Sequence, residues 1–183
     1  MTKVFIGGSR KLVKLPTEVS RRIDNIIQNG FTIIVGDANG ADKGVQRYLA
    51  DKDYEKVVVF CMAGACRNNI GAWKTEYITA DSHEKGFKFY AAKDSAMATE
   101  ATYGFMVWDA KSSGTLNNIV NLLGSNKKVL VYFSPDKKFY TLSSSYDLPK
   151  LLEKCDSETL ENLQKKLGLI HFPRVEQSTM EFV

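Results

Sequence analysis

The sequence predicts an α/β fold of the Rossmann type, with three layers, a mainly parallel central sheet and a short helical C-terminal extension. Short apolar runs with β-branched residues alternate with stretches whose apolar residues fall on one helical face. Three of these runs end in loops of glycines and small polar residues that lead into such a stretch. A strand, a covering helix and a second strand form a unit with parallel strands. The chain of 183 residues is long enough for one such domain with a sizeable core.

The first apolar run, residues 4–6, ends in Gly7, Gly8, Ser9 and Arg10. At a strand end, glycines let the backbone pass close to a ligand because they carry no Cβ. The Ser9 hydroxyl could donate a hydrogen bond, and the Arg10 guanidinium could pair with a phosphate. We therefore expect this loop to contact an anionic ligand. The alternative is a plain turn with a solvated arginine.

A helix and a second strand follow this loop. Pro16 suits a first helical turn, and the apolar residues after it share one face until Gly30 ends the helix. The strand at residues 31–35 leads into a glycine-rich loop and then a helix. Asp37 could hydrogen-bond a sugar hydroxyl, whereas helix capping is the expected role of Asp42. The ligand-binding residues expected in this loop are Gly36, Asp37, Asn39, Gly40, Ala41 and Asp42.

Residues 57–60 are predicted to form the third strand, and residues 61–82 an irregular stretch. Loops this long are uncommon in compact domains unless they are functional. Arg67, followed by Asn68, stands in this stretch after a strand and could reach a phosphate. Trp73 is either a platform on which a base stacks or a core residue. The core is favoured because large aromatic side chains mostly bury.

Residues 87–90 are predicted to form a short strand, and residues 91–101 an alanine-rich helix. Lys93 and Asp94 open this helix and could therefore line a site. Glu100 lies near its end and is a candidate catalytic carboxylate. The alternative for Glu100 is a solvated surface position.

The third loop follows the buried strand predicted at residues 103–108 and begins at Asp109. Small side chains and exposed N–H groups just before a helix make a good anion site. The alternative is a simple helix cap. The residues expected to bind the ligand here are Ser112, Ser113, Gly114 and Thr115. We expect the three loops to converge on one nucleotide-type ligand.

The last main strand is predicted at residues 129–133, and residues 139–142 return as a hairpin or edge strand. Two short helices follow between residues 147 and 167. We therefore divide the chain into a nucleotide-binding domain, residues 1–142, and a helical extension, residues 143–183. The extension is expected to pack on the same domain or on a second subunit, and we expect a homo-oligomer.

Composition excludes several classes of protein. The formal net charge is only +4, and the 25 Lys and Arg residues are spread along the chain, which argues against a nucleic-acid partner. Cys61, Cys66 and Cys155 match no zinc pattern, so we expect free thiols in a reducing cytoplasm and no bound metal. No apolar run is long enough to cross a membrane, and no signal peptide precedes the first strand. We therefore expect a cytoplasmic protein with no membrane partner and no cofactor.

The loops resemble those of the SLOG superfamily, which includes the DprA/Smf proteins and the LOG phosphoribohydrolases. The similar stretches lie within residues 3–133 and follow the order of the family. They are Gly7–Arg10, Gly36–Asp42, Arg67–Asn68 and Gly114–Thr115. The layout is most similar to that of a branch of small bacterial and phage proteins. This resemblance implies a Rossmannoid fold that binds nucleotides or molecules derived from them.

The resemblance also bears on catalysis. In LOG enzymes a Pro-Gly-Gly-x-Gly-Thr-x-x-Glu loop holds the phosphate and supplies a catalytic carboxylate. The similar stretch here runs from Lys111 to Asn118, and Asn118 stands where the family has its glutamate. An amide cannot act as a carboxylate base or nucleophile.

The sequence therefore favours a nucleotide-binding or nucleotide-sensing module, for which the superfamily implies a role in phage defence or counter-defence. The alternative is an enzyme that hydrolyses or transfers at the N-glycosidic bond of a nucleotide. Its transition state would be stabilised by a carboxylate, and Asp109 is the best placed. DNA binding, by analogy with DprA, is the third hypothesis.

Overall fold

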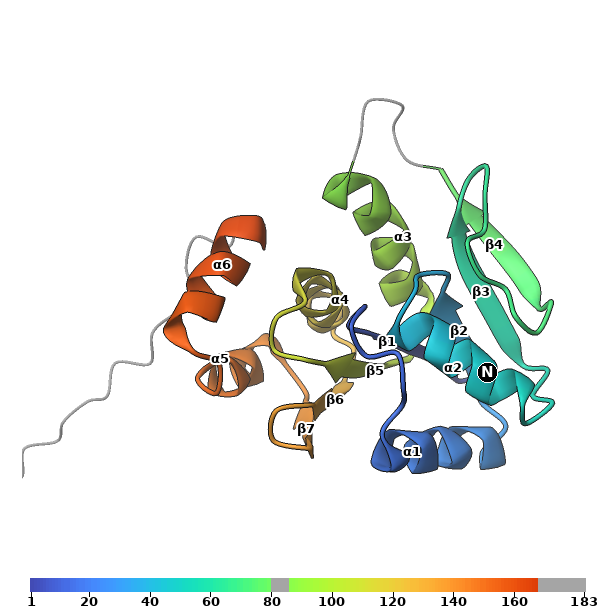
Figure 1. Ribbon diagram of the computed structural model, residues 1–183, viewed down its shortest axis with the longest axis horizontal. Coiled ribbons are helices and arrows are strands. Elements are labelled where there is room, and N and C mark those ends of the chain that lie inside the picture. Colours follow the sequence, from blue (N-terminus) through green and yellow to red (C-terminus); the bar gives the residue numbers. More distant parts are fainter. Residues whose placement is uncertain (80–85, 168–183) are drawn as a thin grey trace, which may run out of the picture.

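The computed structural model describes residues 1–79 and 86–167. Within these residues one seven-stranded sheet has the order β4-β3-β2-β1-β5-β6-β7 (Figure 1). Neighbouring strands are parallel except for the antiparallel pair β6 and β7. The expected mainly parallel sheet and the return strand are thus confirmed. The strands are β1 (Lys3–Gly8), β2 (Thr32–Gly36), β3 (Val57–Met62), β4 (Lys74–Ile78), β5 (Tyr103–Trp108), β6 (Val129–Phe133) and β7 (Lys138–Leu142).

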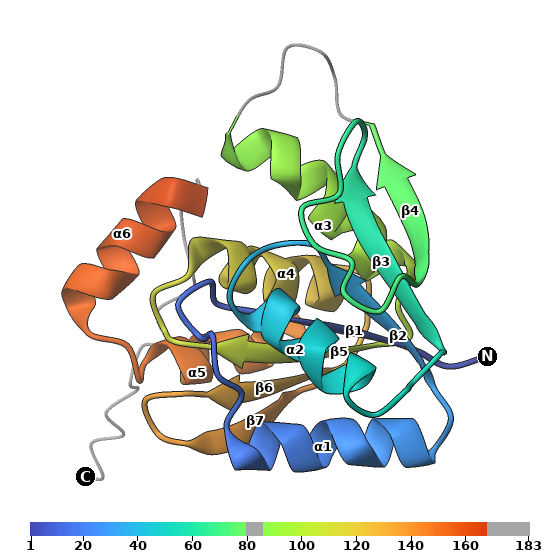
Figure 2. The ribbon, with the colours of Figure 1, turned by 45° about the vertical axis from the view of Figure 1, so that its right-hand side comes forward.

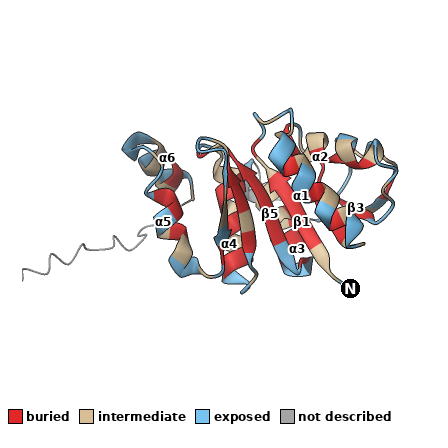
Figure 3. Cartoon of the chain, turned by 90° about the horizontal axis from the view of Figure 1, so that it is seen from below, coloured by how far each residue is buried: buried red, intermediate tan, exposed pale blue. Residues whose placement is uncertain are grey.

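Helices cover both faces of the sheet and complete three layers (Figure 2). One face carries α1 (Thr17–Gln28) and α2 (Ala41–Ala50). The other carries α3 (Phe87–Glu100) and α4 (Ser113–Gly124). A short 3-10 turn, η1 (Ser145–Asp147), leads into α5 (Leu148–Leu152) and α6 (Ser157–Leu167), which join the core cluster of α4, and α6 packs against α4. The central strands are buried between these layers (Figure 3).

Alternation along the central strands divides the core into two clusters. In β2, Ile33 and Val35 pack under α1 and α2, whereas Ile34 packs in the cluster that contains α3 and α4 residues. Successive side chains of a strand point to opposite faces, so a strand that is covered on both faces is apolar throughout. Trp73 belongs to the first cluster, and its indole N–H donates to the Tyr54 carbonyl. Its expected core position is confirmed.

Two predicted elements were wrong. Residues 87–90, expected as a strand, form the first turn of α3. Four residues of alternating character do not distinguish a strand from a helix start, and the helix is fixed by the packing of its later turns, where Met97 is buried. The stretch expected to be irregular contains β4, an edge strand. Its sequence, KTEYI, contains no apolar run because it pairs only with β3 and stays partly exposed.

The helices of the extension pack on the main domain. Leu148, Leu151, Leu152 and Leu163 are buried in the same cluster as residues of α4 and β6. The rest of the predicted extension, residues 168–183, lies outside the described residues. No helix of the described part of the chain is long and apolar enough to span a membrane.

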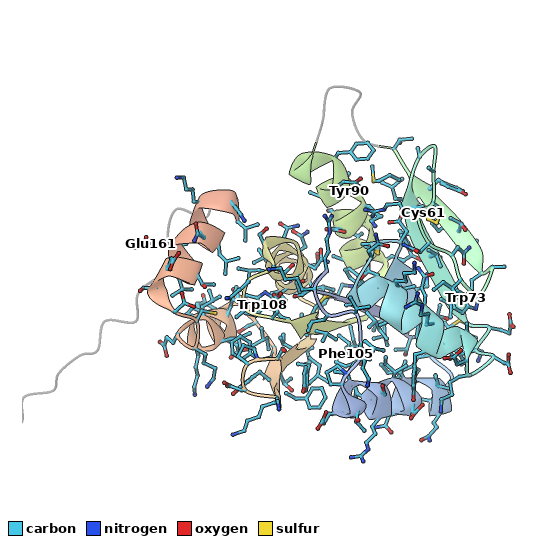
Figure 4. The ribbon with its side chains drawn as sticks, viewed as in Figure 1. Cys61, Trp73, Tyr90, Phe105, Trp108 and Glu161 are labelled. Atoms are coloured by element: carbon cyan, nitrogen blue, oxygen red, sulfur yellow. A yellow bond between two sulfur atoms is a disulfide. The ribbon has the colours of Figure 1, made fainter. Side chains whose placement is uncertain are left out.

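The expectation of three free thiols was wrong for two of the cysteines. Cys61 and Cys66 form a disulfide near the end of β3 (Figure 4). Cys155 is free. A bridge between Met62 and Ala65 turns the chain back after β3 and brings the Cα atoms of the two cysteines to 5.1 Å. That separation is normal for a disulfide. The argument from free thiols to a reducing compartment therefore no longer holds.

Candidate functional site

The three predicted loops meet at the carboxyl ends of β1, β2 and β5, and Ser9 joins them. Its hydroxyl donates to Asp109 Oδ1 at 2.8 Å, and its carbonyl accepts from the Ala41 N–H at 3.3 Å. β1 and β5 are adjacent, yet the helices that follow them, α1 and α4, lie on opposite faces of the sheet. Ligands of open α/β sheets bind at such a point. Ser9 is fully buried, so it supports the loops through these hydrogen bonds and does not line the site.

Asp37 fixes the second loop through a buried ion cluster. Its carboxylate is 1% exposed and accepts from the Arg67 Nε and Nη2 at 3.1 and 2.6 Å and from the Lys93 Nζ at 2.6 Å. Burial by itself would raise the pKa of Asp37, but these hydrogen bonds hold the pKa well below its usual range. Both carboxylate oxygens are thus occupied by protein groups. Asp37 positions Arg67 and Lys93 and has no oxygen left for the sugar hydroxyl suggested by the sequence.

Arg67 and Arg10 lie against one aromatic ring. The Arg67 guanidinium is 4.6 Å from the centre of the Tyr90 ring, and that of Arg10 is 5.9 Å from it. Tyr90 projects from α3 (Figure 4). Guanidinium groups are attracted to the face of an aromatic ring. The ring therefore brings together two cations from loops that are far apart in the sequence.

The third loop leaves two N–H groups at the start of α4. The Ser112 side chain accepts from the Thr115 N–H, and Asp109 Oδ1 accepts from the N–H groups of Lys111 and Ser112. The first N–H groups of a helix have no partner within it. Those of Ser113 and Gly114 consequently have no acceptor among the described residues. A Cβ built on Gly114 would meet nothing within 4 Å, so the backbone is open on this side.

Two adjoining cavities lie over these groups. A pocket of about 60 Å³ is lined by residues of all three loops and of α3. It shares Arg10, Tyr90, Asp94 and the start of α4 with a cleft of about 620 Å³. Lys11, Lys111 and Lys166 add positive charge to the cleft, the last of them from α6. The cleft therefore combines several cations with an open helix N-terminus.

Two carboxyl groups face this positive surface. Burial raises the pKa of Asp94 to about 7, although Lys93, Arg10 and Arg67 act in the opposite direction. Burial likewise raises the pKa of Asp42 to about 6. Asp42 accepts from the Ala38 N–H at 3.3 Å and so closes the second loop, while α2 has no side-chain cap. Carboxyl groups with raised pKa values in a cleft are typical of functional sites.

The structure brings together predicted residues from all three loops. Those lining the pocket are Gly8, Arg10, Asp42, Arg67, Lys93, Ser112, Gly114 and Thr115. Asp109 and Ser113 line the cleft. The remaining predicted residues of the first two loops and Asn68 line neither cavity; they are Gly7, Ser9, Gly36, Asp37, Asn39, Gly40, Ala41 and Asn68.

Glu100 lies away from the site. It pairs with Lys3 at the beginning of β1, on the opposite edge of the sheet from the three loops. We therefore remove Glu100 from the catalytic candidates. Tyr90 was missed because residues 87–90 were predicted as a strand. On a helix, Tyr90, Lys93 and Asp94 share one face, which is the signal that could have found it.

One group of possible metal ligands is present in the described residues. Atoms of Asp37, Cys61 and Cys66 lie within 4.8 Å of one another. Both sulfur atoms are bonded to each other, and the carboxylate is held by two cations. In this arrangement the group offers no ligand to a metal.

Comparison with known proteins identifies a similar fold among solved structures. No protein-family model and no curated protein sequence match the chain. The structure of DNA processing protein A (DprA) from Helicobacter pylori does match, with a TM-score of 0.53 and 16% sequence identity, over 93% of this chain and 82% of that chain. This chain has a DprA-like fold. The match confirms the fold implied by the SLOG resemblance, and at this identity it establishes the fold alone.

A second DprA structure, from Streptococcus pneumoniae, matches with a TM-score of 0.49 and 15% identity, over 71% of this chain and 50% of that chain. The Helicobacter pylori DprA is described as having a unique mode of binding single-stranded DNA.

Proposed function

We propose that the protein binds a nucleotide or a nucleotide-derived small molecule in the cleft, with a phosphate group at the N-terminus of α4. The observation that carries this proposal is the convergence of three anion-binding features. The N–H groups of Ser113 and Gly114 have no acceptor among the described residues, and Arg10 and Arg67 reach the same cavities from two other loops. Helix N-termini and guanidinium groups both favour phosphate.

The size and charge of the cleft support a small anionic ligand. Its volume of about 620 Å³ lies within the range of small-molecule sites. Lys11, Lys111 and Lys166 extend the positive surface beyond the start of α4, which suits a ligand with more than one phosphate. Tyr90 offers an aromatic surface in the same cleft.

We favour a binding or sensing module, with a role in phage defence or counter-defence, over an enzyme. Asp109, the best-placed carboxylate for N-glycosidic chemistry, accepts three hydrogen bonds at Oδ1 from Ser9, Lys111 and Ser112. These bonds hold the Asp109 side chain in the turn before α4. Asn118 supplies no carboxylate in its place.

Calorimetric titration with a panel of nucleotides tests this proposal. The panel contains nucleoside mono-, di- and triphosphates, NAD, ADP-ribose and cyclic nucleotides. Binding of one member is expected, and Arg10→Ala should weaken it about tenfold or more, because a charge-assisted hydrogen bond is lost. Arg21→Ala is the matched control, since Arg21 is an exposed arginine on α1. A panel without any binder would overturn the proposal.

Chromatography of the same mixtures separates binding from turnover. A bound ligand recovered intact after the protein is denatured supports a binding module. Release of free base would instead support the hydrolase, and Asp109→Asn would then be expected to abolish turnover. A salt-sensitive complex with labelled single-stranded DNA would support the third hypothesis.

A homo-oligomer belongs to the same proposal. The exposed residues Val13 and Tyr146 are large hydrophobic side chains that a second subunit could cover. The Cys61–Cys66 disulfide is the observation against a reducing compartment.

A further inference from the structure

Two hydrogen-bond acceptors line the small pocket and lack donors among the described residues. Asn118 on α4 is 8% exposed, and its Oδ1 is buried without a hydrogen-bond partner there. Asp94 on α3 makes no hydrogen bond and no ion pair with the described residues, yet it lines both the pocket and the cleft. α3 and α4 pack against each other, so the two acceptors reach the pocket from neighbouring helices.

Unpaired buried acceptors are rare because they cost free energy, so a ligand that donates to them is favoured. The pocket, at about 60 Å³, has room for roughly two water-sized groups. It accommodates hydroxyl groups but not a purine or pyrimidine ring. An ionised phosphate offers acceptors only and cannot donate to the Asn118 Oδ1 or to an ionised Asp94 carboxylate. A ligand that carries hydroxyl donors close to its anionic group would satisfy both side chains.

We propose that Asp94 and Asn118 accept hydrogen bonds from the 2′- and 3′-hydroxyls of a ribonucleotide whose phosphate lies at the N-terminus of α4. This inference rests on the nucleotide-binding function proposed above. It gives Asp94 the role that the sequence suggested for Asp37, whose oxygens are taken by Arg67 and Lys93. The site accordingly distinguishes ribonucleotides from deoxyribonucleotides.

The test compares the ribonucleotide of the panel that binds most tightly with its 2′-deoxy and 2′,3′-dideoxy forms. Titrations use the full chain at pH 8, where the Asp94 carboxyl, with its pKa of about 7, is mostly ionised. Removal of one hydroxyl is expected to weaken binding about tenfold, because a hydrogen bond to a charged group is lost. Asp94→Ala should weaken ribonucleotide binding about tenfold and leave the affinity for the 2′,3′-dideoxy form, which has neither hydroxyl, unchanged. Asn118→Ala should likewise reduce the preference for the ribonucleotide over its dideoxy form.

The dideoxy ligand checks that each variant still folds, and Glu100→Ala serves as the matched control. Glu100 is a carboxylate on the same helix as Asp94, at the far edge of the sheet, and its removal should change neither affinity. Equal binding of the ribonucleotide and its dideoxy form to the native protein would overturn this inference and leave nucleotide binding intact. An equal loss of ribonucleotide and dideoxynucleotide affinity in Asp94→Ala would also overturn it. Absence of binding by every nucleotide would overturn the proposed function together with this inference.

Discussion

Asp37 holds the second loop in place by a buried network rather than by a surface contact. Lys93 is almost as buried as the carboxylate, with a side chain that is 3% exposed. The Arg67 backbone N–H and the Asn68 amide also bond to Asp37, the amide through the Asp37 carbonyl at 2.7 Å. A charge in such a place is tolerated only because its partners are charged and bonded. The cluster therefore acts as a unit.

Asp37→Asn should lower the free energy of unfolding by about 3–5 kcal/mol, because it leaves the buried Lys93 ammonium without its counter-charge. Chemical denaturation at pH 7 measures this loss. Glu76→Gln is the control, since Glu76 pairs with Lys74 on the exposed edge strand, and we expect a loss of at most about 1 kcal/mol. Equal losses in the two variants would contradict the role given to the cluster.

At the scale of elements, Gly40 sets how closely the first and second loops approach. It lies at the N-terminus of α2 with φ +86°, a backbone conformation that favours glycine. A Cβ added there would collide with the Arg10 carbonyl. The two loops can therefore approach this closely only because residue 40 has no side chain. This close approach places Arg10 beside the pocket.

Gly40→Ala should destabilise the protein by roughly 2–4 kcal/mol and weaken nucleotide binding, since the alanine is strained and must displace the first loop. Thermal denaturation and calorimetric titration measure the two effects. Gly124→Ala, at the end of α4, meets nothing within 4 Å and should leave stability unchanged or increase it by up to about 1 kcal/mol. An unaffected Gly40→Ala protein would show that the loops do not need this close approach.

At the scale of the whole molecule, the site makes stability depend on pH in two opposite ways. The pKa values of Asp42 and Asp94 are raised from 3.8 to about 6 and about 7. From about pH 4 to 7 the folded protein therefore binds more protons than the unfolded chain at these groups, and their contribution to stability falls as pH rises. Asp37 has a lowered pKa, so its contribution is present above about pH 4 and is lost at lower pH.

Asp94→Asn should therefore stabilise the protein at pH 8, by roughly 1–3 kcal/mol, and leave stability nearly unchanged at pH 4.5. The variant removes a charge that is poorly solvated at high pH and absent at low pH. Denaturation at the two pH values gives the difference. A gain of equal size at both pH values would refute the link between the effect and the titration of Asp94.

The helices of the C-terminal extension contribute both to the core and to the cleft. Leu151 and Leu163 are buried with residues of α4, and Lys166 lines the cleft. Homo-oligomer formation stays a prediction.

Much of the fold could be predicted from patterns that are local in the chain. The run at residues 31–35 and the glycines after it define a buried strand and a turn, because side-chain alternation and backbone freedom are properties of neighbouring residues. The same holds for the strand ending at Trp108 and the loop before α4. Loops at the carboxyl ends of parallel strands lie on one edge of the sheet, so their convergence followed from the predicted topology. The sequence by itself thus determined the fold class and the edge of the sheet at which the three loops meet.

Tertiary structure alone decided which groups meet there. Asp37 is bonded to Arg67 and Lys93, which are 30 and 56 residues away in the sequence. Glu100, on the same helix as Lys93, was carried to the opposite edge because the helix runs back along the sheet. The pairing of Cys61 with Cys66 and the contact of Lys166 with the cleft likewise depend on how the chain folds back on itself. The sequence around a residue indicates which face of a strand or helix it occupies and where a turn falls. Its contact partners depend on strand register and helix packing, which involve parts of the chain that are distant in sequence.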